Sequence, residues 1–386
     1  MVQVLKEKVY SQIIVKNSRN ISEISDALNS ILYVPDPRLK PRVILELTTY
    51  LESKFAEDGY PIAVFISYGR NSEVSGFVIC QNDPLYRSYS RKIGTFGWLH
   101  CHTFEICREL IKRCENFLKK YRVRKLRGGV NLPKILGGIG FQFMGFNQQM
   151  LYSIAFTDPD SQVLDYLVRL GYVGESEYTC VRVAESTWKK GRKIDKDIII
   201  RYRTLDELRN MADEIVGLGA NTLHTILPDT SGVKRIYELF DSYAQIPPTF
   251  RLLNPDIDLH KLSDVPQFID AWESCDLANI QMWIPLAYDK KSGELVGALL
   301  GIPDLYESWL GKPITRVNVD TAMIRKDYTG KGIFSALNNI GQLTGNMFGA
   351  TYYEGTTIWS NNRRAIDTIF PHCIPTRKHY MVQKRI

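Results

Sequence analysis

The chain has 386 residues and a formal net charge of +7; 44% of its residues are hydrophobic and 24% are charged. This composition is typical of a soluble globular protein, and the length favours two domains over one. No apolar run approaches the roughly 20 residues of a membrane-spanning helix, and the N-terminus lacks an apolar signal core. We therefore expect a cytoplasmic protein without a membrane partner.

The first half of the chain is predicted to alternate strands and helices. It starts with a strand over 9–15, followed by two helices that Pro35 and Pro37 separate. A strand hairpin, another strand and a long amphipathic helix come next, and Gly171 is a stop signal for a later helix. The predicted elements after the first strand cover 22–32, 41–55, 62–68, 75–81, 94–102, 104–120, 123–130, 161–170 and 178–183.

The second half is predicted to repeat this order after a polar, basic linker over 184–197. A strand over 198–202 precedes Thr204 and Glu207, which have the spacing of a capping box at the start of a helix. Helical stretches extend to residue 243, and a loop-rich region follows. The later elements are a hairpin of 284–288 with 294–302, a strand over 314–324, a helix, and a strand over 350–359.

The turn between strand 314–324 and the next helix reads Tyr-Thr-Gly-Lys-Gly-Ile over 328–333. Free N–H groups and the helix dipole make such a helix start a favourable place for a pyrophosphate. Gly330 and Gly332 allow a sharp turn and close approach of a ligand, and Lys331 adds a cation. Because neither the Walker spacing nor a dinucleotide fingerprint occurs here, the pattern indicates another kind of phosphate site.

This order of strand, Gly-Lys-Gly turn and helix resembles the acyl-CoA-binding segment of the GNAT acetyltransferase superfamily. Gly330, Lys331, Gly332, Ile333 and Leu337 fit the common form of that motif. Strand 350–359 and the following Asn362-Arg-Arg-Ala365 resemble the strand and N-x-x-A sequence that open the last GNAT helix. The motif matches lie in the second half of the chain.

The sequence departs from the family pattern at three positions. Thr329 stands where the family favours Arg or Gln, and Phe334 stands where it favours a small residue. Ile369 occupies the position of a tyrosine that, in many members, protonates the leaving thiolate. The usual acid is therefore expected to be missing or supplied from elsewhere.

The resemblance implies an α/β fold with mixed sheets, built as two tandem GNAT-like acyl-CoA N-acyltransferase domains, residues 1–190 and 191–386. Leu170-Gly-Tyr172 resembles the L-G-F that closes many such domains. Strand 94–102 leads directly into helix 104–120 without a Gly-rich turn, which leaves little room for a pyrophosphate. The first domain is therefore predicted to be a degenerate partner of a catalytic second domain.

The resemblance also implies acetyl-CoA as co-substrate, an amine as acceptor, and no metal. In this fold, free N–H groups of the strand before the turn polarise the thioester, and N–H groups of the turn hold the pyrophosphate. The implied cofactor-binding residues are Ala322, Met323, Ile324, Thr329, Gly330, Lys331, Gly332, Ile333, Phe334 and Asn362.

Asp320 and Glu354 are the candidates for the general base that deprotonates the amine. Adjacent residues on a strand face opposite ways, and the sequence does not fix the register. An ion pair with an arginine therefore remains an alternative for each carboxylate, and deprotonation through a water relay is equally open.

Other clusters favour structural readings. His100, Cys101, His102 and Cys107 match no zinc spacing, and the seven scattered cysteines include no C-x-x-C, so reduced thiols are expected. Residues 108–127 carry nine Lys or Arg against two Glu. Without an aromatic-interleaved motif this run favours a solvated helix face, and nucleic acid is not an expected partner. Four aromatic residues could line a substrate cleft: Trp283, Tyr306, Trp309 and Trp359.

Three functional hypotheses follow. The first is an acetyl-CoA-dependent N-acetyltransferase whose acceptor is unknown. The second keeps the fold but uses a long-chain or aminoacyl donor, as N-myristoyltransferases and the aminoacyl-transferring enzymes of peptidoglycan assembly do. The third is a non-catalytic CoA-binding or scaffold protein, which the departures at Thr329, Phe334 and Ile369 favour. Oligomeric state is not predicted.

Overall fold

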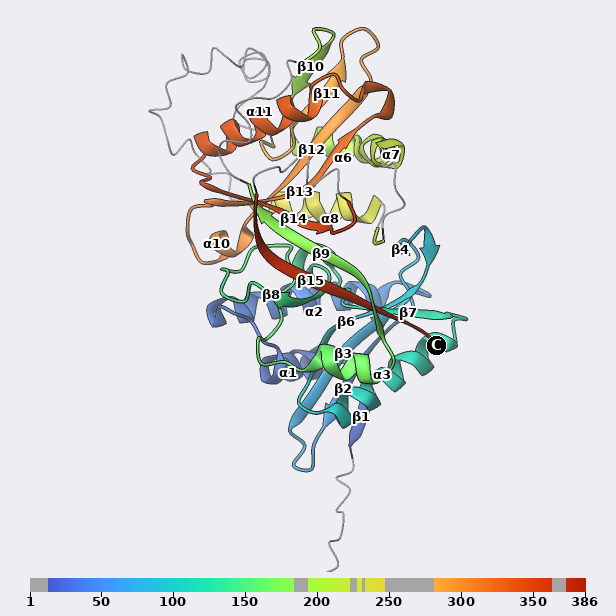
Figure 1. Ribbon diagram of the computed structural model, residues 1–386. Coiled ribbons are helices and arrows are strands. Elements are labelled where there is room, and N and C mark those ends of the chain that lie inside the picture. The colour runs from blue at the N-terminus through green and yellow to red at the C-terminus, as the bar shows by residue number, and fades with distance from the viewer. Residues whose placement is uncertain (1–12, 184–193, 223–227, 231–232, 247–280, 363–372) are drawn as a thin grey trace, which may run out of the picture.

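The computed structural model describes residues 13–183, 194–222, 228–230, 233–246, 281–362 and 373–386 (Figure 1). The predictions for the first strand and the linker fall partly outside these residues. Those for the loop over 247–262, Ala365 and Ile369 fall wholly outside them. The described elements build one mixed sheet of 13 strands, in which β1-β2-β3-β6-β7-β15-β9-β14-β13-β12-β11-β10 are neighbours in that order and β8 pairs with β15. The predicted α/β class with a mixed sheet is confirmed.

The first half supplies one end of this sheet. Helices α1 and α2 cover one face through Leu28 and Leu47, and α3 covers the other through Leu110 and Leu118. Residues alternate between the two faces along each strand, so Val64 packs under α1 and α2 and Phe65 under α3. The bounds are β1 Ile14–Ser18, α1 Ile21–Ile31, α2 Lys40–Ala56, β2 Ile62–Tyr68, β3 Val74–Gln81, β6 Gly94–Cys101, α3 Phe104–Lys119, β7 Lys125–Gly128, α4 Lys134–Gly137, β8 Phe141–Met144, α5 Val163–Arg169 and β9 Val173–Arg182. A separate pair, β4 Arg87–Ser88 and β5 Arg91–Lys92, stands beside the sheet.

The second half supplies the other end. The predicted capping box opens α6, because the side chain of Thr204 accepts from the N–H of Glu207 and the Glu207 side chain accepts from the N–H of Thr204. Helices α7 and α11 cover opposite faces: Gly219 of α7 lies over Met323, and Gly297 of β12 lies under Ile333 of α11. The bounds are β10 Ile198–Arg201, α6 Leu205–Asn210, α7 Ala212–Thr222, α8 Val233–Ala244, β11 Leu286–Asp289, β12 Leu295–Pro303, α10 Leu305–Trp309, β13 Arg316–Ile324, α11 Ile333–Met347, β14 Tyr352–Trp359 and β15 Ile374–Arg385.

The terminal strands of the two halves cross between them. Strand β9, from the first half, pairs with β14 of the second, and β15, at the end of the chain, lies between β7 and β9 (Figure 1). Strand β15 was not predicted, although it contains the strand-forming residues Thr376, Tyr380 and Val382. Strands from both sides of residue 190 belong to the same sheet. The division of the chain into two domains at that residue therefore stays a prediction.

The apolar core is likewise continuous. One cluster of buried side chains joins Leu28 and Leu47 of the first half to Leu299 and Leu337 of the second. Among the described residues, no helix is both long and apolar enough to cross a membrane. No group of three or more potential metal ligands occurs among them either.

Candidate functional site

In the described part of the second half, two parallel strands separate and leave a place where a ligand could bind. Strands β13 and β14 pair from Arg316 with Tyr352 to Val319 with Gly355, and their described pairing ends there. β13 continues to Ile324 along β12, and the register shifts where Leu300 faces Thr321 and Gly301 faces Val319. Asp320 is therefore the extra residue of a β-bulge at the point where the two strands separate.

The bulge and the parting leave one edge of β13 turned away from its partner strand. The N–H of Arg325 donates to the carbonyl of Val296 on β12, at 2.9 Å. Because backbone groups alternate in direction along a strand, the N–H of Ile324 points to the other edge, toward the space between β13 and β14. Such an N–H can donate to a carbonyl oxygen lying between the strands.

The Gly-Lys-Gly turn lies at the end of β13. Gly330 and Gly332 have positive φ angles of 87° and 76°, and Gly332 is the N-cap of α11 in the left-handed conformation, without a side-chain hydrogen bond to the helix start. Only glycine adopts these angles readily, which explains the motif. The N–H groups of the first turn of α11 are therefore not capped by the Gly332 position.

Contacts around Tyr328 hold this turn. Its ring lies between two cations, with the Arg325 guanidinium 4.6 Å and the Lys331 ammonium 4.2 Å from the ring centre. Its hydroxyl donates to the Asp289 carboxylate at 2.9 Å, and the N–H of Asp195 donates to the Lys331 carbonyl at 3.0 Å. The turn is thus anchored to the β11–β12 hairpin and to the chain that enters the second half.

The structure places the predicted cofactor-binding residues in distinct positions. The side chains of Ala322 and Ile324 lie on the face of β13 that α11 covers with its buried Ile333. Met323 lies on the opposite face, which α7 covers. Phe334 is partly buried and packs against the core. Thr329 and Asn362 are exposed, and the N–H of Asn362 donates to the carbonyl of Trp359 at 2.7 Å.

The two predicted bases have different surroundings. Asp320 is half-buried and accepts a hydrogen bond at 3.0 Å from the hydroxyl of Thr321. Glu354 is fully buried and accepts from Arg377 Nε at 3.0 Å. Its carboxylate also accepts from the hydroxyls of Tyr352 and Thr376 at 2.6 and 2.7 Å. This network links β14 to β15. Glu354 therefore forms the ion pair with an arginine that was the alternative to a role as general base.

The corresponding place in the first half is filled by its own side chains. Strands β6 and β7 are also parallel and pair only over Gly94–Phe96 with Leu126–Gly128. The N–H of Trp98, in a second bulge, donates to the Asn131 side chain at 2.7 Å. Thr103 caps α3 by accepting from the N–H of Ile106. One N–H at the bulge and one at the helix start are therefore bonded to side chains of this half.

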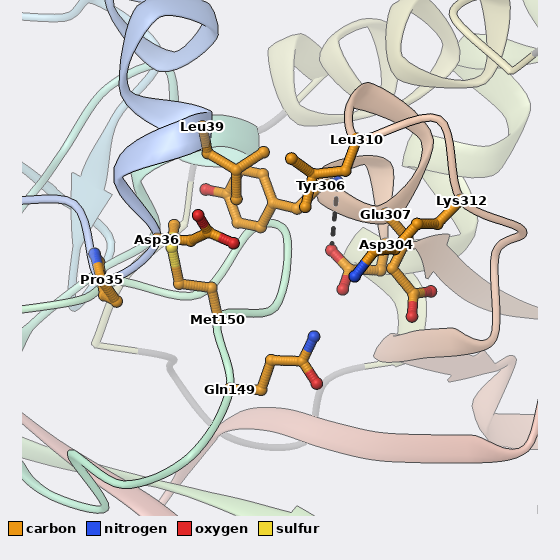
Figure 2. A pocket seen from close by; sticks show the side chains of 10 residues that line it. All are labelled: Pro35, Asp36, Leu39, Gln149, Met150, Asp304, Tyr306, Glu307, Leu310 and Lys312. Carbon is orange, nitrogen blue, oxygen red and sulfur yellow. Dashed lines mark hydrogen bonds between the residues drawn. The ribbon is translucent and has the colours of Figure 1, made fainter.

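A pocket with a volume of about 130 Å³ is lined by residues of both halves. Figure 2 shows Asp36 and Met150 of the first half facing Asp304 and Lys312 of the second across it. Asp304 is fully buried: it accepts from the N–H groups of Tyr152 and Tyr306 and pairs with Arg316 at 3.1 Å. Arg316 also donates to the carbonyl of Met150, so this pair docks the two halves.

Burial of Asp304 predicts a pH dependence of stability. Burial, opposed by Arg316, raises the pKa of this carboxyl from about 3.8 to about 7. A raised folded-state pKa gives stability that is present below the unfolded pKa and is lost as pH rises through the folded value. We expect Tm to fall between about pH 4 and 7 and Asp304→Asn to flatten this fall; equal slopes in melts of the two proteins would contradict the assignment.

The four predicted cleft aromatics do not gather at one place. Tyr306 lines the pocket between the halves, and Trp309 packs edge-on against it, with ring centres 5.5 Å apart. Trp283 lines a smaller apolar cavity under α11, whereas Trp359 packs edge-on against Tyr89 of the first half, at 6.2 Å.

Comparison with known proteins places this architecture. No family model and no curated protein match the chain. Among solved structures, the chain is similar to a tandem GNAT protein from the clavulanic acid biosynthesis pathway, with 10% sequence identity and a TM-score of 0.53. This match covers 97% of the present chain and 98% of the other. An Enterococcus faecalis protein described as a probable N-acyltransferase matches with 9% identity and a TM-score of 0.53, over 97% of this chain and 73% of that one.

A third match is a fungal GCN5-related glucosamine N-acetyltransferase region, at 12% identity and a TM-score of 0.53. It covers 97% of this chain but only 38% of that multi-domain protein. At these identities the likeness shows the fold alone: the chain has the fold of a tandem GNAT protein.

Proposed function

We propose that the protein is an acetyl-CoA-dependent N-acetyltransferase and that its second half is the catalytic one. The observation that carries this proposal is the contrast between the halves at equivalent places. In the second half a left-handed glycine precedes the helix and a bulged strand parts from its neighbour. In the first half the Thr103 side chain caps the helix start, and the N–H of Trp98 at the bulge donates to Asn131.

In this proposal the pyrophosphate binds the N–H groups at the start of α11, and Lys331 balances its charge. The pantetheine arm lies between β13 and β14, and the N–H of Ile324 donates to the thioester oxygen. The amine nitrogen attacks the thioester carbonyl carbon, and the carbon–sulfur bond breaks to release the CoA thiolate, which takes up the proton that the nitrogen loses as the amide forms. The ammonium must first lose a proton, for which we propose Asp320 because Glu354 is held in its buried network.

The cofactor assignment predicts a shift in thermal stability. Acetyl-CoA that binds the folded state should raise Tm by mass action, and Gly332→Asp should abolish this rise because its carboxylate repels the pyrophosphate. The matched control is Gly311→Asp, since Gly311 also has a positive φ, of 69°, and open surroundings. It should keep the rise. No shift for the unchanged protein at millimolar acetyl-CoA would reject the donor, and longer acyl-CoAs would then be compared.

A further inference from the structure

The first half carries a cationic surface that acyl transfer does not use. It consists of the exposed end of α3, the turn after it, and neighbouring positions on β5 and β15. Its members, called the basic surface below, are Lys92, Lys112, Arg113, Lys119, Lys120, Arg122, Arg124, Lys125 and Arg385. All are exposed, and none forms an ion pair with another described residue.

Three separate parts of the chain bring cations to this end of the sheet. Arg385 of β15 is paired with Lys125 of β7, and the N–H of Ile386 donates to the Arg124 carbonyl at 3.0 Å. Gly94 is level with Leu126 in the parallel pair β6–β7, which brings Lys92 to the same end of the sheet. The sequence shows a basic run only over 108–127, and the fold adds cations from both sides of it.

Acidic side chains do not neutralise this surface. Glu115 is the acidic residue within 112–125, and its carboxylate is taken by Lys384 at 3.0 Å and by the hydroxyl of Tyr172 at 3.1 Å. Glu109 faces Arg108, at 3.5 Å, outside the group. Clustered, uncompensated cations repel one another, and an anionic partner relieves that repulsion.

We infer that the basic surface binds single-stranded nucleic acid through its phosphates. Lys112 and Lys119 lie on nearly the same side of α3, about 10 Å apart along the axis, so one strand can place phosphates near both. Tyr121 is 46% exposed among the cations of the turn, and its ring leans on Phe117 with centres 5.2 Å apart. A fixed, exposed ring beside cations is a stacking platform for a base.

An anionic membrane fits this surface less well. Interfacial helices insert an apolar face, whereas the apolar face of α3 is buried against the sheet through Ile106, Leu110 and Leu118. Tyr121 is the single large exposed hydrophobic residue within 104–125. The surface lies in the half of the molecule remote from the Gly-Lys-Gly turn, so its binding is independent of the proposed acetyl transfer (Figure 1).

The test uses fluorescence anisotropy with the full chain and labelled 20-nucleotide oligo(U) and oligo(dT), from 50 to 300 mM KCl. Alanine at Lys119, Lys120, Arg122 and Arg124 together should weaken binding at least tenfold at 100 mM KCl. It should also reduce the slope of log K against log salt by about 3, from about 0.7 for each lost phosphate contact. Tyr121→Ala should weaken binding at least about threefold with an unchanged slope.

The matched control removes four exposed cations elsewhere, by alanine at Lys16, Arg19, Lys196 and Lys290. It should change binding less than twofold, and Tm should show that both quadruple variants fold. The inference is overturned by no binding at 50 mM KCl, or by equal weakening in the control. It is also overturned if the protein binds phosphatidylserine vesicles but neither oligonucleotide, and the alanine variant at the four cations loses that vesicle binding.

Discussion

Replacement of Asp229 with alanine is expected to lower the free energy of unfolding by about 3–5 kcal/mol. Asp229 comes from the second half, and its side chain is 1% exposed. Its two carboxylate oxygens accept from Nε and Nη2 of Arg127 in the first half, each at 2.6 Å, and the hydroxyls of Tyr86 and Tyr178 donate to them as well. Without the carboxylate, the fully buried guanidinium keeps its charge and loses its partner.

Urea unfolding measures this change, and Asp241→Ala is the matched control. Asp241 lies in the same half and faces Arg209 at 3.8 Å, with a side chain 74% exposed. Solvent screens such a pair, so its loss should cost under about 1 kcal/mol. If Asp229→Ala costs no more than Asp241→Ala, the buried pair does not hold the two halves together.

Asp320→Asn is expected to lower kcat by about 10²- to 10⁴-fold, the usual contribution of a positioned general base. Asparagine keeps the shape of the bulge but cannot accept a proton from the ammonium. CoA release would be followed with the fastest amine from a panel of polyamines, aminoglycosides, amino acids and peptides. The acidic limb of the pH profile of kcat/KM should disappear in the variant, which a structural role of Asp320 does not predict.

Two comparisons make this result interpretable. The rise in Tm with acetyl-CoA should survive in Asp320→Asn, which shows that the donor still binds. Asp213→Asn, at an exposed carboxylate of α7, should leave kcat unchanged. A kcat within threefold of the unchanged protein would remove Asp320 as the base and favour deprotonation through water.

Much of the fold could be predicted from the sequence because its signals are local. Strand β2 has the predicted bounds, and α3 differs from its prediction by one residue at its end. The Thr204 capping box and the sharp turn at Gly330 and Gly332 were also predicted, since a cap or a turn depends on residues within a few positions. The order of these elements was enough to indicate two GNAT-like halves.

Other features depended on the tertiary structure alone. A period-2 pattern can identify a strand but not its partner, so the insertion of β15 between β7 and β9 had no sequence signal. Arg127 and Asp229 are 102 positions apart, and no local rule pairs them. The bulge at Asp320 and the pairing of Glu354 with Arg377 distinguished two carboxylates that looked equivalent along the chain. The sequence by itself determined the local elements and the glycine-rich start of α11. Strand pairing between residues far apart in the sequence decided that Glu354 and Asp229 are buried in ion pairs and that Asp320 lies where β13 and β14 separate.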